Sequence, residues 1–138
     1  MVDRSDLQRL AEERLADAQV LFAAGRYSGA FYLAGYAVEC GLKACVAKLT
    51  TAESFPDKEL ADKVYTHNLK RLATAAELDA AIKQREKADP DFEVNWAFVN
   101  FWSEKSRYES WPDVMAKWML DAVSNSAYGV LPWIRQYW

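Results

Sequence analysis

Residues 29–49 form the stretch that most constrains this chain, because its interior is nearly free of charge. Small and larger side chains recur within it at separations of three and four positions, which is the periodicity of a helix. Its longest apolar run is interrupted by Glu39 and is too short to cross a bilayer. We therefore predict a helix enclosed by other helices. Its small-residue stripe, where another helix can approach closely, contains Ala30, Ala34, Ala37, Gly41 and Ala44.

Helical spacing also predicts a first and a third helix on either side of this one. The first begins near a capping box formed by Ser5 and Gln8, and Gly25 is expected to end it. Residues 50–65 break the periodicity, so we expect a loop there. Thr66 is then expected to cap the third helix.

The rest of the chain is predicted to hold an aromatic helix and a last helix. Asp89-Pro90-Asp91 interrupts the pattern before the aromatic helix, and the last helix begins near Pro112. Gly129 and Pro132 should kink or break it. Only 5 glycines and 4 prolines occur in 138 residues, which leaves few turns for an all-β fold. Residues 1–138 are therefore predicted to be one all-α domain, an antiparallel up-and-down bundle of four to five helices.

The charge and the cysteines limit the partners and the location of the protein. A formal charge of −3 gives no general attraction to nucleic acid or to an acidic membrane, so an anion-binding surface would have to be local. The charged N-terminal residues lack the apolar core of a secretory signal. Cys40 and Cys45 lie about 140° apart around a helix, so they cannot pair, and with one distant histidine they make no zinc site. We expect buried thiols in a cytoplasmic protein without metal, cofactor or membrane contact.

The single histidine, His67, restricts the catalytic mechanisms open to the chain. No nucleophile-elbow sequence accompanies it, and no glycine-rich phosphate loop is present. It follows Thr66 at a predicted helix start, where a histidine often makes a local capping or packing contact. We interpret His67 as structural and predict no catalytic residue.

A second stripe on the helix of residues 29–49 is the first candidate binding surface. Its members Tyr32, Tyr36, Glu39 and Lys43 fall at i, i+4, i+7 and i+11 and share one side of the helix. Glu39 and Lys43 have the order that favours a helical ion pair. One interpretation is the wetter face of an inner helix, where amphipathic tyrosines are ordinary. The other is a surface that binds a ligand or a partner.

Arg107 and Tyr108 are the second candidate, located beside Lys105 between the aromatic helix and the last helix. One interpretation is a solvated cluster at a helix end, which suits the negative end of the helix dipole. The other is an arginine that contacts an anion at a helix junction.

Three aromatic residues near the end of the sequence, Trp133, Tyr137 and Trp138, are many for one terminus to bury. Burial and an oligomer contact both remain open for them. Together with the small-residue stripe, they lead us to predict a homodimer.

Several short motifs resemble the HEPN domain (higher eukaryotes and prokaryotes nucleotide-binding). Gly25-Arg26-Tyr27 and Ala37-Val38-Glu39-Cys40-Gly41-Leu42-Lys43-Ala44 are similar to the family's second helix. Thr66-His67-Asn68-Leu69 resembles its H-D/N-L helix start, and Ser106-Arg107-Tyr108 resembles its late R-Y element. These motifs follow the family's order and span most of the chain. The resemblance implies a four- or five-helix bundle that commonly dimerises.

The resemblance also implies what the chain does. Many members are metal-independent ribonucleases that use an arginine followed by four to six residues and a histidine, whereas others bind nucleotides or act beside a minimal nucleotidyltransferase. This sequence lacks the nuclease motif. The histidine expected after Arg107 would fall at residues 112–114, which are Pro, Asp and Val. The arginine expected before His67 would fall at residues 60–62, which are Leu, Ala and Asp.

We therefore expect a non-catalytic, homodimeric module that binds a nucleotide or a protein such as a minimal nucleotidyltransferase. Such a module could also belong to a toxin–antitoxin pair. RNA ranks behind both as a partner. Two alternatives stay open: a metal-independent ribonuclease in which Arg107 meets His67 across the bundle, and a structural dimer module without a small ligand. The expected binding residues are Arg107, Tyr108, Tyr32, Tyr36, Glu39 and Lys43.

Overall fold

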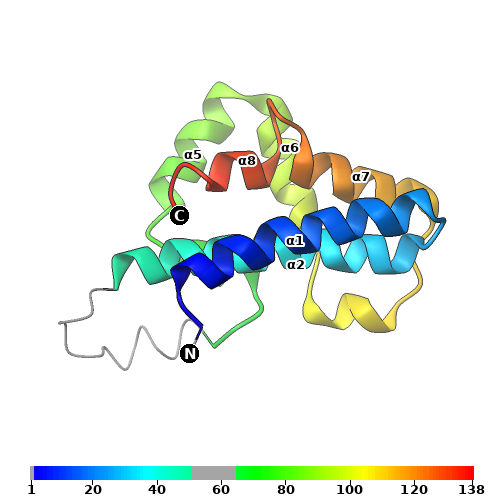
Figure 1. Cartoon of the computed structure of the whole chain (residues 1–138). Helices are drawn as coiled ribbons and strands as arrows, with labels where there is room; N and C mark the ends of the chain where they lie inside the picture. Colours follow the sequence, from blue (N-terminus) through cyan, green and yellow to red (C-terminus); the bar gives the residue numbers. More distant parts are fainter. Residues whose placement is uncertain (1, 51–64) are drawn as a thin grey trace.

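The computed structural model describes residues 2–50 and 65–138, and all regular structure in them is helical (Figure 1). The predicted all-α bundle is confirmed, although it has more and shorter helices than predicted. The loop predicted for residues 50–65 lies almost entirely outside the described residues. The elements are α1 (Arg4–Ala23), α2 (Tyr27–Leu49), α4 (Leu69–Ala75), α5 (Asp79–Ala88), α6 (Pro90–Val99), the short 3-10 helix η1 (Glu104–Tyr108), α7 (Asp113–Ser124) and α8 (Val130–Ile134).

α1 and α2 form a long antiparallel hairpin along one side of the molecule (Figure 1). α1 begins with a capping box, but its members are Asp3 and Asp6 rather than Ser5 and Gln8. Asp6 N donates to Asp3 Oδ1 at 2.9 Å, and Asp3 N donates to Asp6 Oδ2 at 3.1 Å. Carboxylates are favoured here because they are stronger acceptors and complement the positive end of the helix dipole. Gly25 ends α1 as predicted, with a φ of 75° that glycine adopts readily.

α2 is the central helix of the bundle. It packs against α1, α4, η1, α7 and α8, and 13 of its 23 residues are buried. Among the described residues, it is the one helix long and apolar enough to cross a membrane. However, 72% of its most apolar 18-residue window is buried inside the protein, as expected for the core helix of a bundle. The prediction of an enclosed helix is confirmed.

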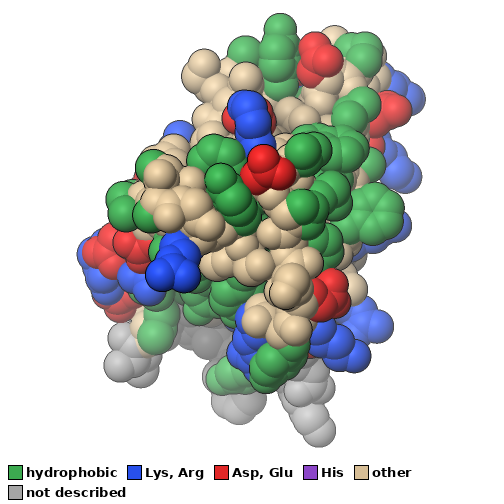
Figure 2. Space-filling model, turned by 90° about the vertical axis from the view of Figure 1, so that its right-hand side faces the viewer, with side chains coloured by type: hydrophobic (Ala, Val, Ile, Leu, Met, Phe, Trp, Pro, Cys, Tyr) green, Lys and Arg blue, Asp and Glu red, His purple; other side chains and the backbone are tan. Residues whose placement is uncertain are grey.

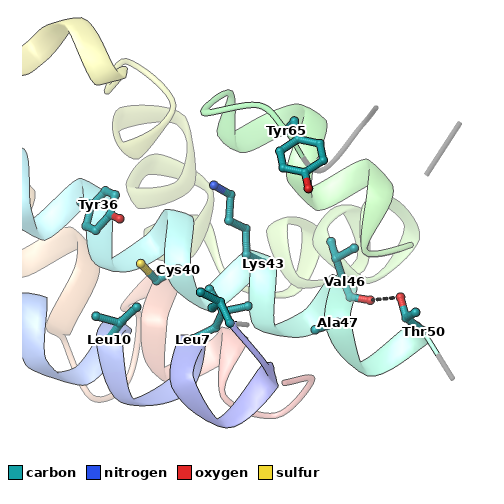
Figure 3. Close-up of a pocket in the computed structure, with 10 residues that line it drawn as sticks. Leu7, Leu10, Tyr36, Cys40, Lys43, Val46, Ala47, Thr50 and Tyr65 are labelled. Carbon is teal, nitrogen blue, oxygen red and sulfur yellow. Dashed lines mark hydrogen bonds between the residues drawn. The ribbon is translucent and has the colours of Figure 1, made fainter. Parts of the chain in front are cut away.

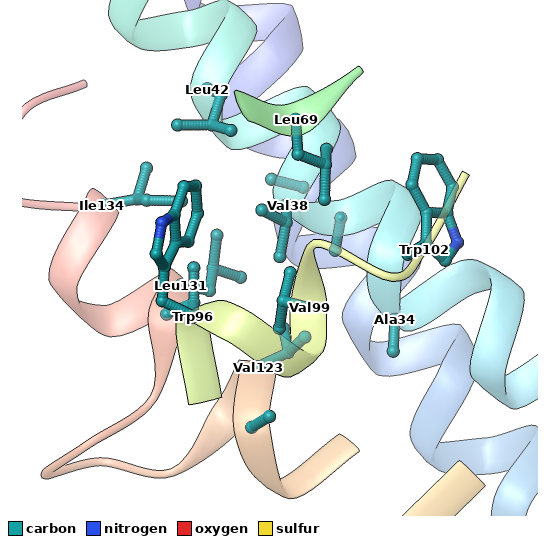
Figure 4. Packing of buried hydrophobic residues seen from close by; sticks show 14 of the residues in the cluster. Ala34, Val38, Leu42, Leu69, Trp96, Val99, Trp102, Val123, Leu131 and Ile134 are labelled. Carbon is teal, nitrogen blue, oxygen red and sulfur yellow. The ribbon is translucent and has the colours of Figure 1, made fainter. Parts of the chain in front are cut away.

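The small-residue stripe of α2 is filled from within the chain. Its fully buried alanines are Ala30, Ala34, Ala37 and Ala44. A Cβ atom on Gly41 would lie 3.0 Å from Leu131 and 3.3 Å from Ile134, both in α8. Figure 4 shows these two side chains in the cluster beside Leu42 and Trp96. The stripe is therefore occupied, and it does not support the predicted homodimer.

The aromatic residues near the end of the sequence also pack onto the chain's own core. Trp133 is 4% exposed, and its ring lies 5.2 Å from the ring of Phe92 and 4.9 Å from that of Tyr137. Tyr137 and Trp138 are partly buried against the same cluster. Burial therefore accounts for these residues, and they no longer argue for a dimer.

The predicted third and last helices are each followed by a separate helix in the structure. Asn68 caps α4 in place of Thr66, because Arg71 N donates to Asn68 Oδ1 at 3.0 Å. α4 ends at Ala75, and Glu77, whose φ is 60°, lies between it and α5, a helix that was not predicted. The predicted break of the last helix near Gly129 is confirmed, because Gly129 precedes α8 and separates it from α7, whereas Pro132 does not break α8. Pro132 lies in the first turn of α8, where the N–H that proline lacks has no partner within the helix.

Candidate functional site

One side of α2 carries a row of aromatic rings beside η1. The Tyr32 ring stacks on Tyr36, with centroids 6.1 Å apart, and on Trp102, with centroids 5.7 Å apart. Trp102 Nε1 also donates to the main-chain oxygen of Tyr32 at 3.0 Å. Figure 4 shows the Trp102 indole lying against α2. The two tyrosines predicted to share a face do so, and a third ring that the sequence did not single out joins them.

Gly35 makes room for the Trp102 indole on α2. A Cβ atom at this position would lie 2.2 Å from Trp102 Cδ1, which is far inside van der Waals contact. Trp102 is consequently 3% exposed although it lies outside any helix. A glycine in a helix interior lowers helix stability by about 1 kcal/mol relative to alanine. The close packing of Trp102 on Gly35 offsets this loss. In the sequence, a glycine inside this helix is a sign that a bulky side chain packs closely at that position, and this sign could have pointed to Trp102.

η1 holds Arg107 and Tyr108 close to the row of rings. It begins with a capping box between Ser103 and the buried Ser106, so the two side chains that follow Ser106 face solvent. The Arg107 guanidinium lies 4.8 Å from the centroid of the Tyr108 ring. The Tyr108 hydroxyl, followed by that of Tyr32, raises the pKa of Arg107 above its ordinary value. The guanidinium is therefore close to both phenols and open to solvent.

Glu39 differs most from its predicted setting. Its side chain is 2% exposed, so it does not belong to a wet face. Lys43 Nζ lies 3.1 Å from Glu39 Oε2, and His67 Nδ1 lies 2.9 Å from Glu39 Oε1. Both carboxylate oxygens therefore have a partner, which a buried carboxylate requires. Glu39 positions other side chains and is not itself available to a ligand.

His67 connects the segment before α4 to the middle of α2. The local capping or packing contact inferred for His67 from the sequence is wrong in being local, because the partner of His67 is Glu39, 28 positions earlier. The capping contact belongs to the next residue, Asn68. Roughly half of the His67 side chain is exposed. No local signal marks this pair, since its members meet only in the folded bundle.

Tyr36 and Lys43 face a pocket of about 590 Å³ between α1, α2 and Tyr65 (Figure 3). Burial raises the pKa of Cys40 to about 11 and that of Tyr36 to about 12. The thiol and the phenol are therefore both neutral near pH 7. The described residues that line the pocket are Val2, Leu7, Leu10, Tyr36, Cys40, Lys43, Val46, Ala47, Thr50 and Tyr65.

Arg107 and His67 do not form a pair within one chain. Arg107 is close to Tyr32, whereas His67 bonds to Glu39, seven residues further along α2. At a rise of about 1.5 Å per residue, these positions are separated by roughly 10 Å along the helix. Among residues 2–50 and 65–138, no group of three or more His, Cys, Asp or Glu side chains is placed to hold a metal ion. The site thus presents an exposed guanidinium and aromatic rings.

Comparison with known proteins agrees with this fold. The chain matches the family model described as "HEPN domain" over residues 5–131. No curated protein and no solved structure gives a match.

Proposed function

The chain belongs to the HEPN domain family, whose proteins are generally related to nucleotides or RNA, and on this premise we propose that it is a binding module for a nucleotide rather than an enzyme. The observation that carries the proposal is the exposed Arg107 guanidinium beside Tyr108 and Tyr32. We define the arginine–tyrosine surface as Tyr32, Tyr36, Arg107 and Tyr108.

The chemistry of the arginine–tyrosine surface suits a nucleotide. A guanidinium offers a planar pair of donors that matches two oxygens of a phosphate, and it stays charged at any physiological pH. Tyrosine rings give a nucleobase a flat apolar face, and base–aromatic stacking tolerates every base. Because the net charge of the protein is −3, this attraction is local, and binding should weaken as salt is added.

Two of the residues predicted to bind have other roles in this proposal. Glu39 is buried and holds Lys43 and His67, so neither Glu39 nor Lys43 is assigned to the arginine–tyrosine surface. The absence of the arginine–histidine spacing from the sequence, and the separation of Arg107 from His67, both favour binding over RNA cleavage.

Titration with ATP, followed by calorimetry, tests the proposal. Arg107→Ala should weaken ATP binding by about tenfold or more, the usual effect of losing a charge-assisted contact, and Arg107→Lys should give an intermediate loss. Arg71→Ala removes an exposed arginine from α4 and serves as the matched control. Unchanged ATP affinity in a folded Arg107→Ala protein would refute the assignment, as would a wild-type protein that binds no nucleotide.

The proposal includes a homodimer that forms through α6 and α7. Val94, Phe101 and Val114 are exposed, and Trp118, also exposed, stacks on Phe98 with centroids 3.9 Å apart. α6 and α7 pack against each other, and exposed apolar side chains on neighbouring elements are candidates for a protein contact. On the face at the α1–α2 turn, Figure 2 shows hydrophobic side chains near the centre and most of the Lys and Arg side chains toward the margins. A minimal nucleotidyltransferase, as in a toxin–antitoxin pair, is the protein partner we propose for the dimer.

A further inference from the structure

We propose that the pocket between α1 and α2 binds an uncharged apolar molecule that carries a carbonyl acceptor. This site shares Tyr36 with the arginine–tyrosine surface but lies on the other side of that residue's position along α2, toward Lys43 and Val46, and the proposal does not depend on nucleotide binding. The pocket volume of about 590 Å³ lies within the usual range for small-molecule sites, roughly 300–1,000 Å³. Three observations carry the proposal: apolar walls, a fixed ammonium group, and local charges that already balance.

The walls of the pocket are mostly hydrocarbon. Leu7 and Leu10 come from α1, Val46 and Ala47 come from α2, and the Tyr65 ring stands at the opposite edge (Figure 3). A ligand that fills this space gains free energy from the apolar area it removes from water. Hydrocarbon alone gives little specificity, however, so the polar groups of the pocket decide which molecules it prefers.

The polar groups of the pocket are donors in fixed positions. Lys43 Nζ is held 3.1 Å from the buried Glu39 Oε2, and an ammonium group has more N–H donors than this one bond uses. The Tyr36 hydroxyl lies on the same side of α2 (Figure 3). Because Glu39 already holds the Lys43 ammonium group in place, a ligand that accepts a hydrogen bond from it costs little further side-chain entropy. The pocket therefore favours a molecule with an exposed lone pair.

The charge balance excludes an anion as the preferred ligand. The Lys43 charge is already matched by the Glu39 carboxylate, whose other oxygen accepts a hydrogen bond from His67 Nδ1. A ligand carboxylate would gain the attraction of Lys43 but would also meet the repulsion of Glu39. Cys40 is a neutral thiol at pH 7, because burial raises its pKa to about 11, so a bound carbonyl is not attacked and binding is reversible.

Three matched probes test the proposal on the wild-type protein. These are 4-phenyl-2-butanone, isopentylbenzene, which has the same shape but lacks an acceptor, and 3-phenylpropionate, which carries a charge. Titrations followed by amide NMR shifts should give the ketone the lowest Kd, about five- to tenfold below the other two, the effect of one hydrogen bond. Equal affinities for all three, tighter binding of the carboxylate, or no binding of the ketone would each overturn the proposal.

Variants then locate the ketone. Ala47→Phe fills the pocket from a half-buried position and should raise the Kd by at least about tenfold, whereas Ala97→Phe, on the exposed side of α6, should leave it unchanged. The double variant Glu39→Gln/Lys43→Met removes the ammonium group without leaving a buried carboxylate unpaired. In that protein the ketone should bind no better than isopentylbenzene. The site would be refuted if the ketone still bound the double variant more tightly than the hydrocarbon probe did, or if Ala47→Phe left the Kd of the ketone unchanged. ATP binding, measured in parallel, reports separately on the proposed function.

Discussion

Replacing Gly35 by alanine should destabilise the protein, although alanine is the better helix former. The new Cβ atom would lie 2.2 Å from Trp102 Cδ1, 2.3 Å from Cγ and 2.4 Å from Nε1. These atoms belong to a rigid ring whose hydrogen bond to Tyr32 fixes its position. The indole must therefore leave its place on α2, or the helix must bend.

The size of the effect follows from three contributions. Overpacking a filled site costs roughly 1–3 kcal/mol, and the loss of the hydrogen bond from Trp102 Nε1 to Tyr32 adds about 1 kcal/mol. Removing a glycine from a helix interior recovers about 1 kcal/mol. Gly35→Ala should therefore lower the free energy of unfolding by about 1–3 kcal/mol. Because Trp102 lies directly before η1, the same change should also displace Arg107 and weaken ATP binding.

Urea unfolding followed by circular dichroism measures this loss against two comparisons. Gly29→Ala changes the same helix, but its Cβ atom would meet only the flexible end of Leu21 at 3.2 Å, so its effect should be near zero or stabilising. In a Trp102→Ala background, Gly35→Ala should become stabilising by about 0.5–1 kcal/mol, since only helix propensity remains. If Gly35→Ala matches Gly29→Ala in the wild-type background, the argument from close packing is refuted.

Three further predictions concern pH, RNA and assembly. Burial raises the pKa of Cys40 to about 11 and of Cys45 to about 12, above the ordinary value of 9.0. The contribution of these neutral thiols to stability is therefore complete below about pH 9 and is lost as the pH rises toward 11. The urea midpoint of the wild type should fall over that range, and that of the double variant Cys40→Ala/Cys45→Ala should fall less. His67→Ala should leave any cleavage of single-stranded RNA unchanged, and a large loss of a real activity would favour the ribonuclease alternative. Light scattering at micromolar concentration should give the mass of two chains for the wild type and the mass of one chain for Phe101→Ser. A single-chain mass for the wild type would contradict the dimer.

The helices that sequence reasoning located well are those with a continuous apolar side. α1 and α2 have such a side over their whole length, and the predicted stop at Gly25 is confirmed by its positive φ. The separate helix α5 was not predicted, because the turn before it is made by Glu77, a non-glycine residue with a positive φ for which composition gives no signal. The capping box was placed two residues too late, since Asp3 and Asp6 lie directly before the apolar repeat and were not considered.

The candidate site was predicted only where its residues share one element. Tyr32 and Tyr36 were placed together because helical spacing fixes their relation, and the structure confirms it. The burial of Glu39 was not foreseen, since it depends on His67, which folding brings in from another segment. Charge alone suggested a wet face. Pairing, rather than polarity, decided where this carboxylate lies.

The central position of α2 has a consequence for how the chain is made. α2 is as apolar as a membrane-spanning helix, and it is complete at Leu49, yet α7 and α8, which cover it, begin only at Asp113 and Val130. At a synthesis rate of roughly 5–20 residues per second, the nascent chain carries this incompletely covered helix for several seconds. During that time α1 is its main cover, and α4 and η1 can add to it only after they have been made. Translation therefore creates an interval in which part of the apolar surface of α2 is uncovered, and truncation before Asp113 should yield an aggregating product.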